Sequence, residues 1–299
     1  MELTWLMRAR IAAAMTIGVV LIGILAWPIA APYDPMGPVR AGNVTAAGAI
    51  ALALLALAAN LIAYFACWPY GREIAVLATP SGVAVWAIRS GSMAELMQLN
   101  PTFSQRQALY ATLKLEPIFW LAIIAAGFAG VILGQKLLPT KNPAESEQER
   151  KSNPSNYLNP LIGLAGSGLI VLFCITILAQ DVEMADNTVG MVLGQPAVGQ
   201  IVFAILVSFG LAAFVVKRYL NVNYIWPIIA GCFITPFAIS IYARANVLEH
   251  LAQRWAPIFF SNAAISILPV QLISLGALGS IAGYWLAVRY NYRRGHKTQ

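Results

Sequence analysis

The sequence is poor in charged residues: Asp, Glu, Lys and Arg together make up 10% of its 299 residues, whereas 59% are hydrophobic. A soluble domain usually has about a quarter of its residues charged, so the composition excludes an ordinary soluble protein and favours a membrane protein. With only two histidines, a multi-haem or polyhistidine metal site is excluded. The three cysteines lie in or beside apolar runs without a pairing pattern, and we interpret them as small buried hydrophobic residues.

The motifs of common catalytic and cofactor sites are also missing. The chain has no glycine-rich phosphate loop, H-E-x-x-H sequence, cysteine cluster or carboxylate dyad, so we expect neither a metal nor another cofactor. No predicted span has an ionisable residue near its middle, which disfavours a proton-coupled carrier because such carriers use these groups. The polar side chains expected inside the spans are Asn60, Thr176, Gln180, Asn262, Ser266, Gln271 and Ser274.

Long apolar runs are abundant, and a helix needs about 20 apolar residues to cross the hydrocarbon core. The run at residues 73–88 is short, so it is either an eighth span with snorkelling arginines at its ends or a re-entrant helix. Arg8 and Arg10 before the first run resemble a signal peptide, but the run is long for one, and we favour an uncleaved span. The seven clear runs are residues 11–31, 46–68, 117–138, 158–180, 197–216, 224–243 and 260–288.

Basic residues predict the number of crossings and the orientation. Eight crossings with a cytoplasmic N-terminus place 13 of the 19 basic residues inside, whereas seven crossings place only 8 or 11 inside, depending on orientation. The sequence therefore predicts eight spans in the cytoplasmic membrane with both termini cytoplasmic. The pI near 9.5 then reflects orientation and attraction to an anionic inner leaflet, so the expected partner is the lipid bilayer and not nucleic acid.

A polar linker at residues 139–157 divides the chain into a first half, residues 1–138, and a second half, residues 158–299. In each half a Thr-Pro pair precedes an aromatic residue, with seven residues from Thr79 to Trp86 and from Thr235 to Tyr242. We predict two parallel four-helix repeats, related by an axis along the membrane normal. The alternative is that membrane composition alone produced the similarity.

The halves differ before their last spans. Ten residues separate Pro117 from Gly127, but nineteen separate Pro257 from Gly276. We therefore predict that the stretch after Pro257 begins as an interfacial segment and bends at Pro269 before it crosses.

Proline and glycine mark positions where the helices are expected to bend or to approach closely. Pro80 and Pro236 each lie in the third helix of a half, where proline removes a backbone hydrogen bond, so they are candidate hinges; membrane helices also tolerate proline without a function. Small residues four apart allow two backbones to approach. The candidate packing glycines, which would join the fourth and eighth helices or form a homodimer seam, are Gly130, Gly134, Gly279 and Gly283.

Charges of both signs gather in the loops between the third and fourth helix of each half. The candidate ligand-binding residues are Arg89, Glu95, Arg244 and Glu249, although intramolecular salt bridges are the alternative. The loop at residues 89–116 has apolar residues at helical spacing, so we expect it to lie on the membrane surface as a cap.

The segment Ser90-Gly91-Ser92-Met93 resembles the nucleophile motif of type I signal peptidases. The resemblance implies Ser92 as nucleophile and Lys114 as the nearest candidate base. It covers four residues, lacks the proline typical of the motif, and no downstream segment resembles that family's β-rich catalytic domain. A serine at a helix start is the simpler interpretation.

Three classes of function remain after these exclusions. A permease-type protein that translocates a small or amphipathic substrate without proton coupling fits parallel repeats with kinked third helices. A scaffold or subunit of a membrane complex, or a homodimer, fits the glycine seams. A membrane enzyme is the third class, and it would depend on outer-face residues, chiefly Asp34, Arg89, Glu95 and His250.

Overall fold

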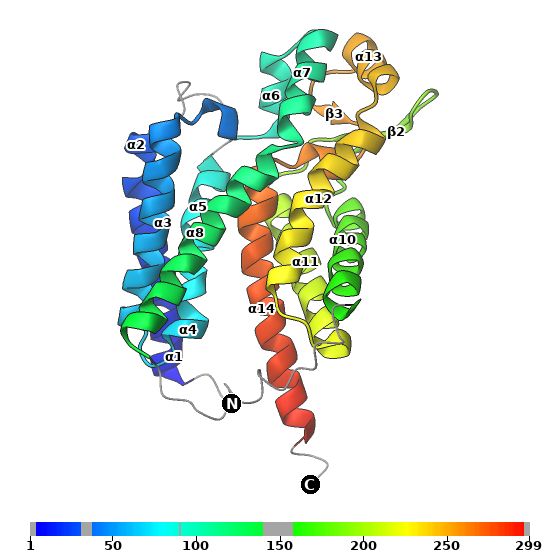
Figure 1. Ribbon diagram of the computed structural model, residues 1–299. Coiled ribbons are helices and arrows are strands. Elements are labelled where there is room, and N and C mark those ends of the chain that lie inside the picture. The colour runs from blue at the N-terminus through cyan, green and yellow to red at the C-terminus, as the bar shows by residue number, and fades with distance from the viewer. Residues whose placement is uncertain (1–3, 31–37, 90, 140–157, 296–299) are drawn as a thin grey trace.

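The computed structural model describes residues 4–30, 38–89, 91–139 and 158–295, which form a bundle of long helices below a cap of short helices and strands (Figure 1). Seven single helices in this part of the chain are long and apolar enough to cross a membrane. The bent pair Gly71–Arg89 with Met93–Leu99, at 48°, is an eighth candidate. The protein is therefore a mainly α-helical integral membrane protein with seven or eight candidate spans.

The first half contains four long helical stretches that run alternately up and down (Figure 1). Helix α1 continues directly into a π-helix, η1, and the third stretch is interrupted by a 3₁₀ turn, η3. The elements are α1 (Trp5–Gly18), η1 (Val19–Leu25), α2 (Trp27–Ala30), η2 (Ala41–Asn43), α3 (Ala46–Ala66), α4 (Gly71–Ile74), η3 (Ala75–Leu77), α5 (Ala78–Arg89), α6 (Met93–Leu99), α7 (Phe103–Leu113) and α8 (Glu116–Leu137).

The second half also has four long helices, and a small antiparallel sheet of order β1-β2-β3 lies beside their upper ends. Asp186 pairs with Gly190 at the tip of the β1–β2 hairpin, where Gly190 has a positive φ of 85° that suits glycine. The elements are α10 (Leu158–Leu178), β1 (Glu183–Asp186), β2 (Gly190–Gly194), α11 (Val198–Leu220), α12 (Ile225–Tyr242), α13 (Ala245–Arg254), β3 (Phe259–Phe260), η4 (Ala263–Ser266) and α14 (Pro269–Gly295).

The bundle has two distinct ends. We call the end where α1 begins and α14 ends the terminal end, and the opposite end, where α6, α7 and α13 lie, the cap end (Figure 1). The cap helices are amphipathic and bury their apolar side chains, including Met93, Leu96 and Leu109, in the main core. The segment predicted to lie on the surface is thus part of a packed cap.

The last span begins at Pro269, where the sequence predicted a bend before the crossing, and not at residue 260, where the apolar run starts. Helix α14 starts at Pro269, and residues 259–266 form β3 and η4 instead of the start of a helix. Proline suits the first turn of a helix because the N–H group that it lacks would have no partner within the helix at that position. Just before it, the Leu268 N–H donates to Gln271 Oε1 at 3.1 Å, which satisfies one free donor at this helix start.

The predicted packing glycines face second helices of their own halves. A Cβ atom at Gly130 would overlap the carbonyl oxygen of Leu57 in α3, and Gly134 lies against the Tyr64 ring. In the second half, Gly279 lies against Leu206, and a Cβ at Gly283 would overlap the carbonyl oxygen of Gly210 in α11. Close backbone contact therefore holds α8 against α3 and α14 against α11.

Replacing these glycines with alanine should destabilise the protein. Gly130→Ala and Gly283→Ala each force two helices apart, so we expect a loss of about 1–3 kcal/mol, measured by thermal unfolding in detergent. Gly166→Ala in α10 is the control, because nothing lies within 4 Å of a Cβ there. Equal melting temperatures for Gly283→Ala and the control would contradict the packing.

Candidate functional site

A pocket of about 160 Å³ lies between α8 of the first half and α12 of the second half. Its walls come from the middle of α8 and the first turns of α12, so it is formed by segments about 100 residues apart in the chain. Ala125 and Ile225 are exposed, and the pocket opens to the surface beside them. Every lining residue is apolar: Leu121, Ile124, Ala125, Phe128, Ile225, Ile228 and Ile229.

A row of aromatic rings closes the pocket toward the terminal end. Phe128, which lines the pocket, meets the Tyr224 ring edge-on with centroids 6.3 Å apart. Tyr224 in turn meets Tyr284 of α14 at 5.3 Å. The ammonium group of Lys217 lies 4.9 Å from the centroid of the Tyr284 ring, a cation–π contact.

Two glutamines join the halves toward the cap end. Gln195 accepts the Ala94 N–H of α6 at 3.1 Å and donates to the Ser266 carbonyl of η4 at 3.2 Å. Gln271 of α14 is 2% exposed and donates to the carbonyl oxygens of Ala87 and Gly91 at 3.4 and 3.5 Å. These amides satisfy backbone groups of both halves at once, so they tie the halves together above the pocket.

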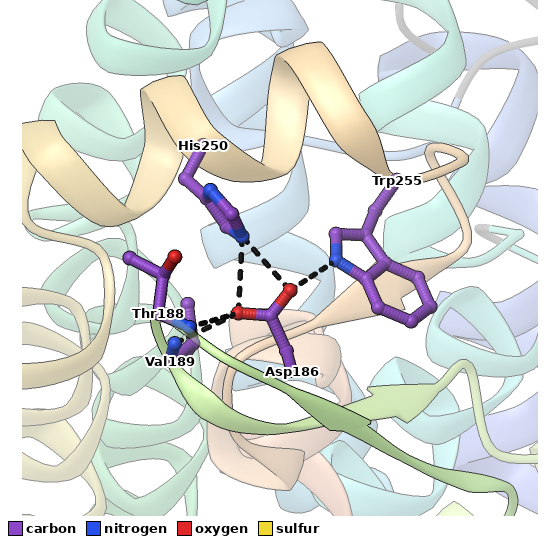
Figure 2. Close-up of polar contacts among 5 residues, drawn as sticks. All are labelled: Asp186, Thr188, Val189, His250 and Trp255. Atoms are coloured by element: carbon purple, nitrogen blue, oxygen red, sulfur yellow. Dashed lines mark hydrogen bonds and ion pairs between the residues drawn. The ribbon is translucent and has the colours of Figure 1, made fainter.

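The cap contains a polar site apart from the pocket, centred on Asp186 at the end of β1 (Figure 2). His250 Nε2 lies 3.0 and 2.8 Å from the two carboxylate oxygens, and Trp255 Nε1 donates to Oδ2 at 2.8 Å. The backbone N–H groups of Thr188 and Val189 donate to Oδ1 at 2.8 Å each. The side chains of His250 and Asp186 are 13% and 8% exposed.

These donors determine the charge of the Asp186 carboxyl. Its hydrogen bond with His250, followed by those from the Val189 N–H and Trp255, holds its pKa well below the usual value. Within the described residues, no hydroxyl or thiol is hydrogen-bonded to His250, so the pair lacks the nucleophile of a catalytic triad. The site is therefore suited to fastening the β1–β2 hairpin to α13.

The four predicted ligand-binding residues make separate local contacts. Arg89 lies over the Trp27 ring at 5.2 Å and donates to the Gly23 carbonyl at 3.4 Å. Glu95 accepts a hydrogen bond from Ser92 Oγ at 3.3 Å, and Glu249 accepts one from Gln253 at 3.3 Å. Arg244 is exposed at the start of α13. In the described part of the chain, no ion pair or hydrogen bond joins any two of the four.

The candidate hinges differ in their surroundings. Pro80 lies in the first turn of α5, directly after η3, whereas Pro236 lies inside α12. Thr79 donates through its N–H and its hydroxyl to Asn60 Oδ1 at 2.9 and 2.8 Å, so the irregular backbone before Pro80 is satisfied from α3. In α12, the Ser240 hydroxyl donates to the Pro236 carbonyl at 2.7 Å.

Ser92 is the N-cap of α6. Its hydroxyl oxygen accepts the Glu95 N–H at 3.3 Å, which is the usual role of serine at a helix start. The predicted Asp34 lies outside the described residues. Among the residues that are described, no group of three His, Cys, Asp or Glu side chains is placed to hold a metal ion.

Sequence reasoning did not find the pocket, the role of Gln195 or the Asp186–His250 contact. Asp186 and His250 stand out as outer-face charges, but 64 residues separate them and no local pattern pairs them. The pocket residues have the same apolar character as the rest of their spans. No family model, curated protein or solved structure matches the chain.

The Asp186 site predicts a pH-dependent stability. Because folding lowers the pKa of this carboxyl, its contribution is complete above the usual value of 3.8 and is lost as the pH falls toward the lowered pKa. Asp186→Asn points an amide N–H₂ group at other donors, so we expect a lower melting temperature at pH 7 and faster hydrogen exchange in residues 183–194. The difference from wild type should shrink below about pH 4.

Asp181→Asn provides the control, because Asp181 is an exposed aspartate close to the same hairpin. It should melt and exchange like the wild type at each pH. A gap between Asp186→Asn and wild type that stays constant down to pH 2 would contradict the role of the carboxylate.

Proposed function

We propose that this protein is a permease-type translocator of a small or amphipathic substrate, and that the pocket between α8 and α12 is its substrate site. The observation that carries the proposal is the position of this apolar pocket between the two halves, with separate contacts above and below it. Transporters built from repeats bind substrate near the membrane midplane at the interface between the repeats.

Similar packing in the two halves supports a repeat. In each half, glycines of the fourth helix meet backbone of the second, at Gly130 against Leu57 and at Gly279 against Leu206. Each third helical stretch contains a Thr-Pro pair. We therefore retain two parallel four-helix repeats, with residues 139–157 as a polar linker, as part of the proposal.

Alternating access needs a closure on each side of the site that can open independently. Toward the terminal end this closure is the contact among Phe128, Tyr224 and Tyr284. Toward the cap end it consists of the hydrogen bonds of Gln195 and Gln271. Pro236 in α12 is the hinge candidate nearest to the lining residues in sequence, and bending there would move one pocket wall.

The distribution of charge supports a substrate that moves without proton coupling. The pocket lining has no titratable side chain, and proton-coupled carriers use such groups within the membrane. The excess of basic residues predicted at the terminal end supports a cytoplasmic location of that end and of both termini, in the cytoplasmic membrane.

A second candidate function is that of a subunit in a membrane complex. The edge strand β1 pairs with β2 on one side only, and an open edge can accept a strand from a partner. Val182, Met184 and Met191 on this hairpin are 43–50% exposed. A partner chain that shields these residues would fit this surface.

Flux through the pocket can be measured in proteoliposomes. NBD-labelled single-chain amphiphiles with anionic, zwitterionic or cationic headgroups are tested one at a time, and dithionite quenching follows their movement across the bilayer. We expect the wild type to move at least one of them. A pH gradient should not change the rate. Ala125→Trp fills the pocket and should slow flux by about tenfold, since overpacking costs about 1–3 kcal/mol.

Ala165→Trp in α10 is the matched control, because Ala165 is exposed on a span that does not line the pocket. It should move the amphiphile like the wild type. Rates equal to those of protein-free vesicles for every headgroup, or equal slowing by the two tryptophan variants, would overturn the proposal.

A further inference from the structure

The pocket between α8 and α12 has the dimensions and chemistry of a site for one hydrocarbon chain. Its volume of about 160 Å³ is well below the ~300–1,000 Å³ of typical small-molecule pockets. A slender chain fits such a space, whereas a bulky ring system does not. Because all seven lining residues are apolar, any polar group of the ligand has to lie outside the pocket.

Positive charge lies beyond the row of aromatic rings at the terminal end of this pocket. Three successive contacts lead from Phe128 in the lining through Tyr224 and Tyr284 to the Lys217 ammonium group. Lys217 is held there by Asn221, whose Oδ1 accepts its hydrogen bond at 2.8 Å. Asn221 adopts a left-handed conformation, with φ 53°, that ends α11 at this position.

The neighbouring ionisable groups leave this region positive. Tyr224 packs against the cluster of buried residues that contains Ile74 of α4, the helix that carries Arg72 and Glu73. Arg218 lies over the Tyr290 ring at 5.6 Å. Among the described residues, this region thus has three cations, Arg72, Lys217 and Arg218, and one carboxylate, that of Glu73. An anionic group is attracted here, and a cationic one is repelled.

We propose that this pocket binds the single hydrocarbon chain of an anionic amphiphile whose headgroup lies at Lys217 and Arg72. The headgroup lies beyond the contact among Phe128, Tyr224 and Tyr284, so this contact is open in the state that binds the amphiphile. The two tyrosine rings then suit the boundary, because an aromatic ring with a hydroxyl group contacts both a chain and a headgroup. The inference names the substrate class and takes its site from the proposed function.

Binding of two lysolipids with the same acyl chain tests the headgroup. The full-length protein in detergent is titrated with lysophosphatidylglycerol, which is anionic, and with lysophosphatidylcholine, which is zwitterionic, and native mass spectrometry gives each Kd. The wild type should bind the anionic lipid more tightly. Lys217→Gln should weaken anionic binding about fivefold and leave the zwitterionic Kd unchanged, since one basic residue near a membrane surface contributes about that factor.

Three further variants separate the headgroup from the chain. Lys217→Arg should retain the preference for the anion, and Lys136→Gln, which removes an exposed charge at the same end of the bundle, should leave both Kd values unchanged. Ala125→Trp should weaken both lipids, whereas Ala165→Trp should weaken neither. Equal Kd values for the two lipids in the wild type, or equal effects of Lys136→Gln and Lys217→Gln, would overturn the inference.

Binding and flux can fail independently. If the wild type prefers the anionic lipid but no amphiphile crosses the vesicle membrane, the inference stands and the proposed function falls. If amphiphiles cross without any preference for the anion, the proposed function stands and the inference falls.

Discussion

Hydrocarbon offers no hydrogen bonds, so each backbone group in the membrane needs a partner within the protein, and this constraint governs the helix packing. Where the backbone departs from α-helix, side chains take the released groups. The Trp86 indole N–H donates to the Ile22 carbonyl in the π-helix η1 at 2.7 Å. The Thr79 N–H, just after the 3₁₀ turn η3, donates to Asn60. The irregular turns therefore tie α5 to its neighbours η1 and α3.

The polar side chains that join the two halves lie away from the apolar pocket. Tight glycine contacts hold α8 against α3 and α14 against α11, and the rings of Tyr64 and Phe209 pack against glycines in these two interfaces. Between α8 and α12 the space is lined by larger apolar residues and is incompletely filled. Polar groups that join the halves lie above this space, at Gln195 and Gln271, and the charged groups around Lys217 lie below it. The chain of a single-chain amphiphile matches the apolar pocket, and its headgroup matches the charged groups around Lys217.

The cap gives the bundle a fixed polar surface at one end. Asp186 fastens the hairpin to α13 through three short contacts with His250 and Trp255, and it accepts two more from N–H groups of the hairpin's own turn. Gln195 fastens α6 to η4. Both ties join short elements, which would otherwise be held mainly by their few apolar contacts. The residues predicted to bind a ligand on this face, Arg89 and Glu95 among them, are used locally to complete helix ends and ring contacts.

The sequence by itself determined that the chain is a helical membrane protein and where most long helices lie, because spanning a bilayer depends on the local run of apolar residues. It also indicated glycines that pack closely, because absence of a side chain is a local property. Hydropathy alone began the last apolar run at residue 260, but the nine extra residues after Pro257 predicted the bend at Pro269, where α14 begins. Only the tertiary structure decided which helix each glycine meets, that Asp186 meets His250, and that α8 and α12 enclose a pocket. These depend on the relative positions of segments 60 or more residues apart, which hydropathy does not encode.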